Sequence, residues 1–132
     1  TKVDQGSSAN TVSENGSYSG KTFVSTGDNE NALRIDGATV DFDNITVDKS
    51  AGATSNAENG DFYGVNAAIL ASNGATVTIK KSTVTSATRN GNGVFSYGSG
   101  TTVNIHDTKI TTTADNSGGI SLPRQDHKAC RG

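Results

Sequence analysis

The fold is decided by the segment Gly37-Ala38-Thr39-Val40-Asp41-Phe42, because this segment returns twice further along the chain. The later copies are Gly74-Ala75-Thr76-Val77-Thr78-Ile79 and Gly100-Thr101-Thr102-Val103-Asn104-Ile105. These two copies lie 26 residues apart, whereas the first two lie 37 apart. Self-similarity at a fixed period is typical of repeat architectures. We therefore expect coils of about 26 residues, one of which carries an insertion at residues 50–64.

Apolar and polar residues alternate along each copy of the repeat. In the first copy the apolar face consists of Val40, Phe42, Ile45 and Val47, and the polar face of Thr39, Asp41, Asp43, Thr46 and Asp48. A period of two residues predicts a strand with one buried face. Asn-Gly and Asp-Gly pairs separate these strands and predict turns, since both residue types tolerate positive φ. No stretch has the 3.6-residue period of a long helix.

The repeat predicts an all-β fold, a right-handed parallel β-helix. Stacked coils would place equivalent residues about 4.8 Å apart in ladders. The expected inward ladders are Val40/Val77/Val103, Phe42/Ile79/Ile105 and Val47/Val84/Ile110. Such a narrow column explains how 31% hydrophobic residues can suffice for a core. An antiparallel sandwich is the alternative, but it would not require a repeat in register.

The length of 132 residues allows one domain, and a net charge of −2 argues against a basic nucleic-acid-binding domain. No apolar run is long enough for a membrane span. We expect residues 1–122 to form the β-helix, with 1–30 as an N-terminal cap or partial coil. Residues 123–132 match no coil and form a basic tail. The single Cys130 in this tail is expected to be a free, exposed thiol.

Several phrases of the sequence resemble a family of bacterial secreted or surface right-handed β-helix proteins, described as adhesin-like or carbohydrate-binding. They are Gly27–Val40, Glu58-Asn59-Gly60-Asp61-Phe62-Tyr63-Gly64, Asn90–Gly98 and Asp115–Ile120. The resemblance implies a pectate-lyase-like fold without assured lyase activity, an extracellular or cell-surface location, and calcium-assisted binding of acidic polysaccharide. Family members continue for many more coils, so we expect this chain to be truncated after three to four coils.

Two carboxylates on the polar face of the first copy, Asp41 and Asp43, are the candidate calcium ligands. They alternate on one face of a strand, about 6 to 7 Å apart, and calcium prefers oxygen ligands. The alternative is a solvated acidic face. The inserted loop provides the candidate carbohydrate-binding residues Asp61, Phe62 and Tyr63, because aromatic rings stack on sugars and binding residues concentrate on loops. Alternatively, the two aromatic side chains hold the loop against the solenoid.

Lys80 is the fourth candidate carbohydrate-binding residue. A lysine can bind a uronic-acid polymer directly, although a column of Asp43, Lys80 and His106 is also what simple cross-strand charge pairing produces. Nucleophile elbows, zinc motifs and phosphate loops are absent from the sequence. Acidic and basic residues also do not cluster as lyase chemistry would need. We therefore expect that the chain is not an enzyme.

These observations predict a non-catalytic extracellular or cell-surface module that binds carbohydrate, an acidic polysaccharide in particular, with calcium as the cofactor. One alternative is a structural subunit whose open solenoid ends stack head to tail into a fibre. A lesser alternative is an ice-binding surface built on Thr76-Val77-Thr78 and Thr83-Val84-Thr85, although charged residues interrupt the threonine array in the neighbouring coils.

Overall fold

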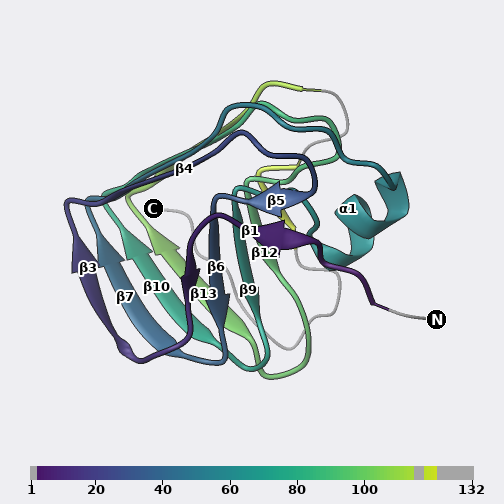
Figure 1. Ribbon diagram of the computed structural model, residues 1–132. Helices are drawn as coiled ribbons and strands as arrows, with labels where there is room; N and C mark the ends of the chain where they lie inside the picture. Colours follow the sequence, from purple (N-terminus) through teal and green to yellow (C-terminus); the bar gives the residue numbers. More distant parts are fainter. Residues whose placement is uncertain (1–2, 115–117, 122–132) are drawn as a thin grey trace.

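A computed structural model describes residues 3–114 and 118–121, and in these residues the chain winds as a parallel β-solenoid (Figure 1). The strands stack into three sheets of four or five strands, and every strand pair in the described residues is parallel. The sequence-based prediction of an all-β fold of stacked parallel strands is thus confirmed.

The first sheet, here called sheet C, consists of β3 (Gly16–Ser19), β7 (Thr39–Asp43), β10 (Thr76–Lys80) and β13 (Thr102–His106). The second, sheet D, consists of β4 (Thr22–Ser25), β8 (Thr46–Lys49), β11 (Thr83–Ser86) and β14 (Lys109–Thr112). The third, sheet B, consists of β2 (Thr11–Val12), β6 (Leu33–Asp36), β9 (Ile69–Ser72), β12 (Val94–Ser96) and β15 (Ile120–Ser121). A separate pair joins β1 (Ser7–Ser8) to β5 (Glu30–Asn31).

The register of the sheets confirms the three predicted ladders. Val40, Val77 and Val103 face one another in sheet C, as do Phe42, Ile79 and Ile105. Val47, Val84 and Ile110 form the third ladder, in sheet D. Eight of these nine residues are fully buried, and Ile110 is half-buried. The core is therefore a narrow column of mainly β-branched side chains, a shape that the alternating sequence dictates.

Larger side chains close the column at its N-terminal end. Tyr18 of β3 stacks on Phe42 with a centroid distance of 5.4 Å, and Phe23 of β4 meets Phe42 edge to face at 6.1 Å. Tyr18 and Phe23 are half-buried. Aromatic rings at this position cover the first complete coil, where a valine or isoleucine would leave it open.

One corner of the interior is polar. Lys49, at the end of β8, is fully buried and aligned in register with Ser25 and Ser86. Its Nζ donates hydrogen bonds to Ser25 Oγ, at 2.9 Å, and to the carbonyl of Gly27. Ser25 Oγ in turn donates to Glu30 Oε1 at 2.6 Å. Burial lowers the pKa of the Lys49 ammonium from 10.5 to about 8, although Glu30 and Asp28 act in the opposite direction.

A short helix, α1 (Ala57–Tyr63), lies within residues 50–64, where the sequence predicted an inserted loop. It begins at Asn56, whose side chain accepts a hydrogen bond from the Asn59 amide, and ends at Gly64 in the left-handed conformation, with φ at 81°. The predicted basic tail 123–132, including Cys130, lies outside the described residues. Within the described part of the chain, no helix is long and apolar enough to cross a membrane.

Candidate functional site

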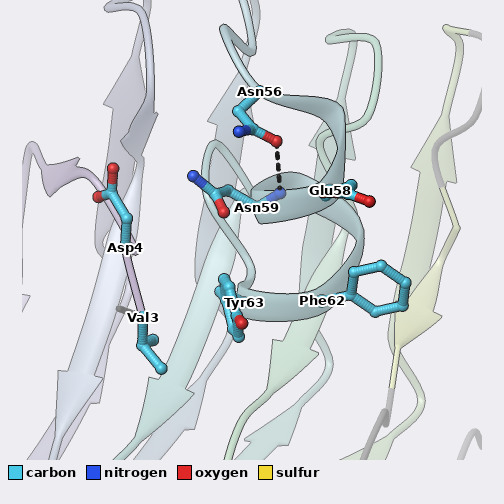
Figure 2. A pocket seen from close by; sticks show the side chains of 7 residues that line it. All are labelled: Val3, Asp4, Asn56, Glu58, Asn59, Phe62 and Tyr63. Carbon is cyan, nitrogen blue, oxygen red and sulfur yellow. Dashed lines mark hydrogen bonds between the residues drawn. The ribbon is translucent and has the colours of Figure 1, made fainter. Parts of the chain in front are cut away.

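An open groove of about 620 Å³ lies between the N-terminal segment and α1 (Figure 2). Its lining residues are Val3, Asp4, Asn56, Glu58, Asn59, Phe62 and Tyr63. Figure 2 shows Val3 and Asp4 on one side, across from the part of the helix that carries Asn59 and Tyr63, whereas Phe62 extends from the other side of the helix. The lining therefore includes amide and carboxylate groups and two aromatic rings, which lie on different sides of the helix.

A second hollow of about 360 Å³ adjoins the first, because both are lined by Asp4, Asn56 and Asn59. It continues past Asp28 and Asn29, and its remaining lining residues are Gly6, Ser7, Ser55 and Val65. The two aromatic side chains line only the first hollow, and the second is lined mainly by polar side chains.

The N-terminal wall of the groove is fixed by Arg34 of β6. Its Nη2 donates hydrogen bonds of 2.7 to 3.3 Å to the carbonyls of residues 5–7. The same guanidinium contacts Asn31 Oδ1, at 3.0 Å from Nε and 2.8 Å from Nη2. Gln5 then links the two walls, because its Nε2 donates to the carbonyl of Tyr63 at 3.1 Å. The groove is consequently held at a set width by hydrogen bonds from the solenoid.

The helical wall is seated on the neighbouring coil at Gly60. A Cβ at this position would lie 2.4 Å from the carbonyl oxygen of Asn90, so only glycine allows this approach. Thr54 Oγ1 donates to the carbonyl of Arg89 at 2.7 Å, and Asn92 Nδ2 donates to the carbonyl of Gly60 at 3.3 Å. These contacts make α1 a fixed element rather than a free loop.

The two aromatic residues of the groove differ in their surroundings. Tyr63 packs edge to face against Tyr97, with a centroid distance of 5.6 Å. Phe62 is 56% exposed, so it is not held against the solenoid. The sequence left open whether this pair binds a ligand or packs; Tyr63 packs and Phe62 presents its ring to solvent. An exposed ring on a fixed helix is suited to stacking on an apolar ligand face.

Among the described residues, the charged side chains that line the site are all acidic. Asp4, Glu58 and Asp28 are among the lining residues, and in the described part of the chain no lysine, arginine or histidine lines either hollow. Arg34 lies behind the N-terminal wall; burial lowers the pKa of its guanidinium, and Asp36 opposes that effect. A ligand in the groove thus meets carboxylates and amides, which favours hydroxyl groups and disfavours anions unless a cation bridges them.

The structure divides the predicted site residues between two places. Phe62 and Tyr63 line the groove, whereas Asp61 lies on the same helix outside the lining and accepts a hydrogen bond of 3.3 Å from Asn90 Nδ2. Lys80 ends β10 of sheet C, is exposed, and lines neither of the two hollows beside the helix. The structure therefore brings only two of the four predicted carbohydrate-binding residues together in one cavity.

The predicted metal ligands Asp41 and Asp43 do lie together, and Lys80 joins them. All three line a shallow hollow of about 300 Å³ on the outer face of sheet C, beside Tyr18. Lys80 is aligned in register with Asp43 on one side and with His106 on the other, which is the column that the sequence predicted. An ammonium beside one of the carboxylates competes with a metal ion for it. In residues 3–114 and 118–121, no group of three or more His, Cys, Asp or Glu is arranged to hold a metal ion.

Threonines form an ordered column on the outer face of sheet D. Thr22, Thr46 and Thr83 are aligned from one coil to the next, but Lys109 occupies the following position. In the adjacent column, Asp48 precedes Thr85. The charges that interrupt the threonine pattern in the sequence therefore lie within the array itself.

The sequence analysis missed the N-terminal wall and the polar residues of the helix. Asp4 and Asn29 come from segments that no motif distinguishes, and only the folded chain places them beside α1. The helix itself had local signals, because Asn56 is a favoured N-cap residue and Gly64 a favoured residue just past a helix end. From these two signals a short helix could have been predicted in place of the loop.

The fold and the groove define a parallel β-solenoid that carries an open, aromatic and acidic cavity on an inserted helix. In comparisons with known proteins, no family model, no curated protein and no solved structure matches this chain.

Proposed function

We propose that the chain is a non-catalytic carbohydrate-binding module of the adhesin-like kind, which works outside the cell or on its surface. The single observation that carries this proposal is the groove between residues 3–7 and α1, whose lining includes the exposed Phe62, the ring of Tyr63 and the polar groups of Asn56 and Asn59. Sugars present an apolar C–H face and a rim of hydroxyl groups. The first suits an aromatic ring, and the second suits amide and carboxylate partners.

The scaffold supports a binding role because the site is largely preformed. The hydrogen bonds of Arg34 and Gln5 hold the N-terminal wall, and the close approach of Gly60 to Asn90 holds the helix. A fixed site loses little conformational entropy when it binds a flexible polymer. We also propose that the solenoid winds right-handed, because crossovers between parallel strands are right-handed in nearly all sheets. A coil of 26 residues is part of the same proposal, since Thr76 pairs with Thr102 in register.

The charge of the groove refines the ligand class. Asp4, Asp28 and Glu58 favour a neutral glycan, and an acidic polysaccharide would need calcium to bridge its carboxylates to those of the protein. Calcium remains part of the proposal in that bridging role only. Asp4, Asp28 and Glu58 would then supply protein oxygens to the ion, and the glycan would supply others.

Calorimetric titration tests the proposal. Neutral oligosaccharides and polygalacturonate are each titrated with and without calcium, and we expect heat from a neutral glycan in both buffers and from polygalacturonate only with calcium. Phe62→Ala should weaken binding on the order of tenfold or more, as the loss of an aromatic anchor does. Asp61→Ala, on the same helix but outside the groove, is the matched control and should bind as the parent does.

Two outcomes would count against the groove. Binding that survives Phe62→Ala unchanged would place the glycan elsewhere on the molecule. Binding of polygalacturonate without calcium, lost in Lys80→Met, would place an acidic glycan on the outer face of sheet C.

A further inference from the structure

The N-terminal end of the solenoid presents unprotected strand edges. β3 and β4 are the outermost strands of sheets C and D, and within the described residues neither has a partner on its outer side (Figure 1). Natural edge strands are usually protected by charged residues, proline or bulges. The strands Gly16–Ser19 and Thr22–Ser25 contain no charged residue and no proline. Their free backbone groups are available for pairing with another strand.

Apolar surface accompanies these edges. Tyr18 and Phe23, which cover the first coil, are only half-buried. Val24 of β4 points outward and is 48% exposed, a high value for a large apolar residue on a strand. Edge backbone and apolar side chains thus occur on the same end of the molecule, a combination that favours association.

The opposite end differs. Val103 and Ile105 of β13, the outermost strand of sheet C at that end, are fully buried. Half-buried apolar side chains also occur toward that end, at Ile110 and Ile120, but among the described residues of β13, β14 and β15 no large apolar side chain is as exposed as Val24. Head-to-tail stacking would need two complementary open ends, whereas contact between two N-terminal ends needs one. The second arrangement is isologous and closes as a dimer.

The charges that flank β3 fit such a dimer. Glu14 lies two residues before the strand and Lys21 two residues after it, and both are exposed. When two copies of β3 pair antiparallel about a two-fold axis, the start of each strand lies beside the end of the other. Glu14 of one copy then lies near Lys21 of the second copy, at two symmetry-related places. Head-to-head contact therefore combines charge complementarity with backbone pairing.

We propose that the N-terminal end of the solenoid, formed by β3 and β4, is a dimerisation surface for a second copy of this chain. The strands and flanking charges that carry the proposal, residues 14–25, do not line the glycan groove. The dimer would display two grooves at once, which raises the avidity for a polymer. The proposal stands independently of the carbohydrate proposal, because strand edges and flanking charges carry it.

Sedimentation equilibrium over a range of protein concentrations tests the dimer with a charge exchange. The parent should reversibly form dimers. Glu14→Lys alone and Lys21→Glu alone each replace two attractions by two repulsions, and each should weaken the dimer on the order of tenfold at low salt. The double variant Glu14→Lys with Lys21→Glu restores opposite charges and should recover the parent affinity. High salt should reduce the differences.

Val24→Lys is a second variant, because a lysine on the edge strand blocks pairing; it should leave the protein monomeric with an unchanged far-ultraviolet circular dichroism spectrum. The proposal is overturned by a parent that stays monomeric at every concentration or by a double variant that remains as weak as the single variants. It is also overturned by particles that grow beyond two copies with concentration, which would indicate head-to-tail stacking instead.

Discussion

Because Lys49 is buried, the stability of the solenoid changes with pH in the alkaline range. Its ammonium is fully enclosed beside Ser25 and the carbonyl of Gly27, and burial lowers its pKa to about 8 from the 10.5 of an exposed lysine. The charged form is thus less favourable in the native state than in the unfolded chain. Replacing Lys49 by methionine keeps the apolar stem and removes the group that titrates.

The sign and size of the effect follow from the shift in pKa. Between pH 8 and 10.5 the unfolded chain binds more protons at Lys49 than the native state does, so the free energy of unfolding increases with pH. Below pH 8 Lys49 is protonated in both states, so the native state carries the full cost of burying the ammonium. Each pKa unit corresponds to about 1.4 kcal/mol, so the total gain from Lys49 is about 3 kcal/mol.

Urea unfolding at a series of pH values from neutrality to pH 10.5 measures this gain. Other groups titrate in the same range, and the comparison of variants removes their contribution. The parent and Lys80→Met, which lacks an exposed lysine of sheet C, should share the rise in stability. Lys49→Met should lack about 3 kcal/mol of it. Identical pH dependence in the parent and Lys49→Met would refute the reasoning, whatever their stabilities at neutral pH.

Three further predictions concern the scaffold and are measured by urea unfolding at neutral pH. Gly64→Ala should lower the free energy of unfolding by about 2 kcal/mol or more, because φ is 81° and a Cβ would lie within 2.9 Å of two buried side chains. Gly74→Ala, where φ is 77° and the space is open, should lower it by about 1 kcal/mol. Equal losses in the two variants would contradict the packing argument. Ile79→Ala in the central ladder should cost about 3 kcal/mol, and the exposed Thr76→Ala less than about 0.5; a small loss for Ile79→Ala would mean that the column is not a packed core. Asn56→Ala removes the helix cap and should lower the free energy of unfolding by about 1 kcal/mol. No loss of stability would mean that the Asn56 side chain does not cap α1.

The sequence predicted the stacking of the coils well, because stacking depends on local pattern. Alternation assigned the inward residues, and the spacing of the repeat assigned which of them face one another, as Val77 faces Val103. Alternation is carried by each coil separately and spacing by the comparison of neighbouring coils, so both can be read directly from the sequence. The short helix was missed because the capping signals at Asn56 and Gly64 occur in a segment whose composition is typical of loops.

The site could be predicted only in part. The sequence singled out Phe62 and Tyr63, which line the groove, because aromatic residues are conspicuous in a polar insertion. Asp4 was not, because its place opposite the helix depends on hydrogen bonds from Arg34 to the N-terminal segment, and no sequence pattern encodes that path. For Lys80 the sequence allowed either ligand binding or charge pairing, and the register places it between Asp43 and His106, as the predicted column requires.

The most direct test of the central claim, that the groove binds carbohydrate, is to map the contact by amide chemical shifts. The chain is labelled with nitrogen-15 and titrated with the neutral oligosaccharide that gives the largest heat. We predict that the perturbed amides belong to residues 4–7 and 56–63, which form the two walls, while those of β7 and β10 stay unchanged. Perturbation confined to β7 and β10, or none at saturating oligosaccharide, would contradict the claim.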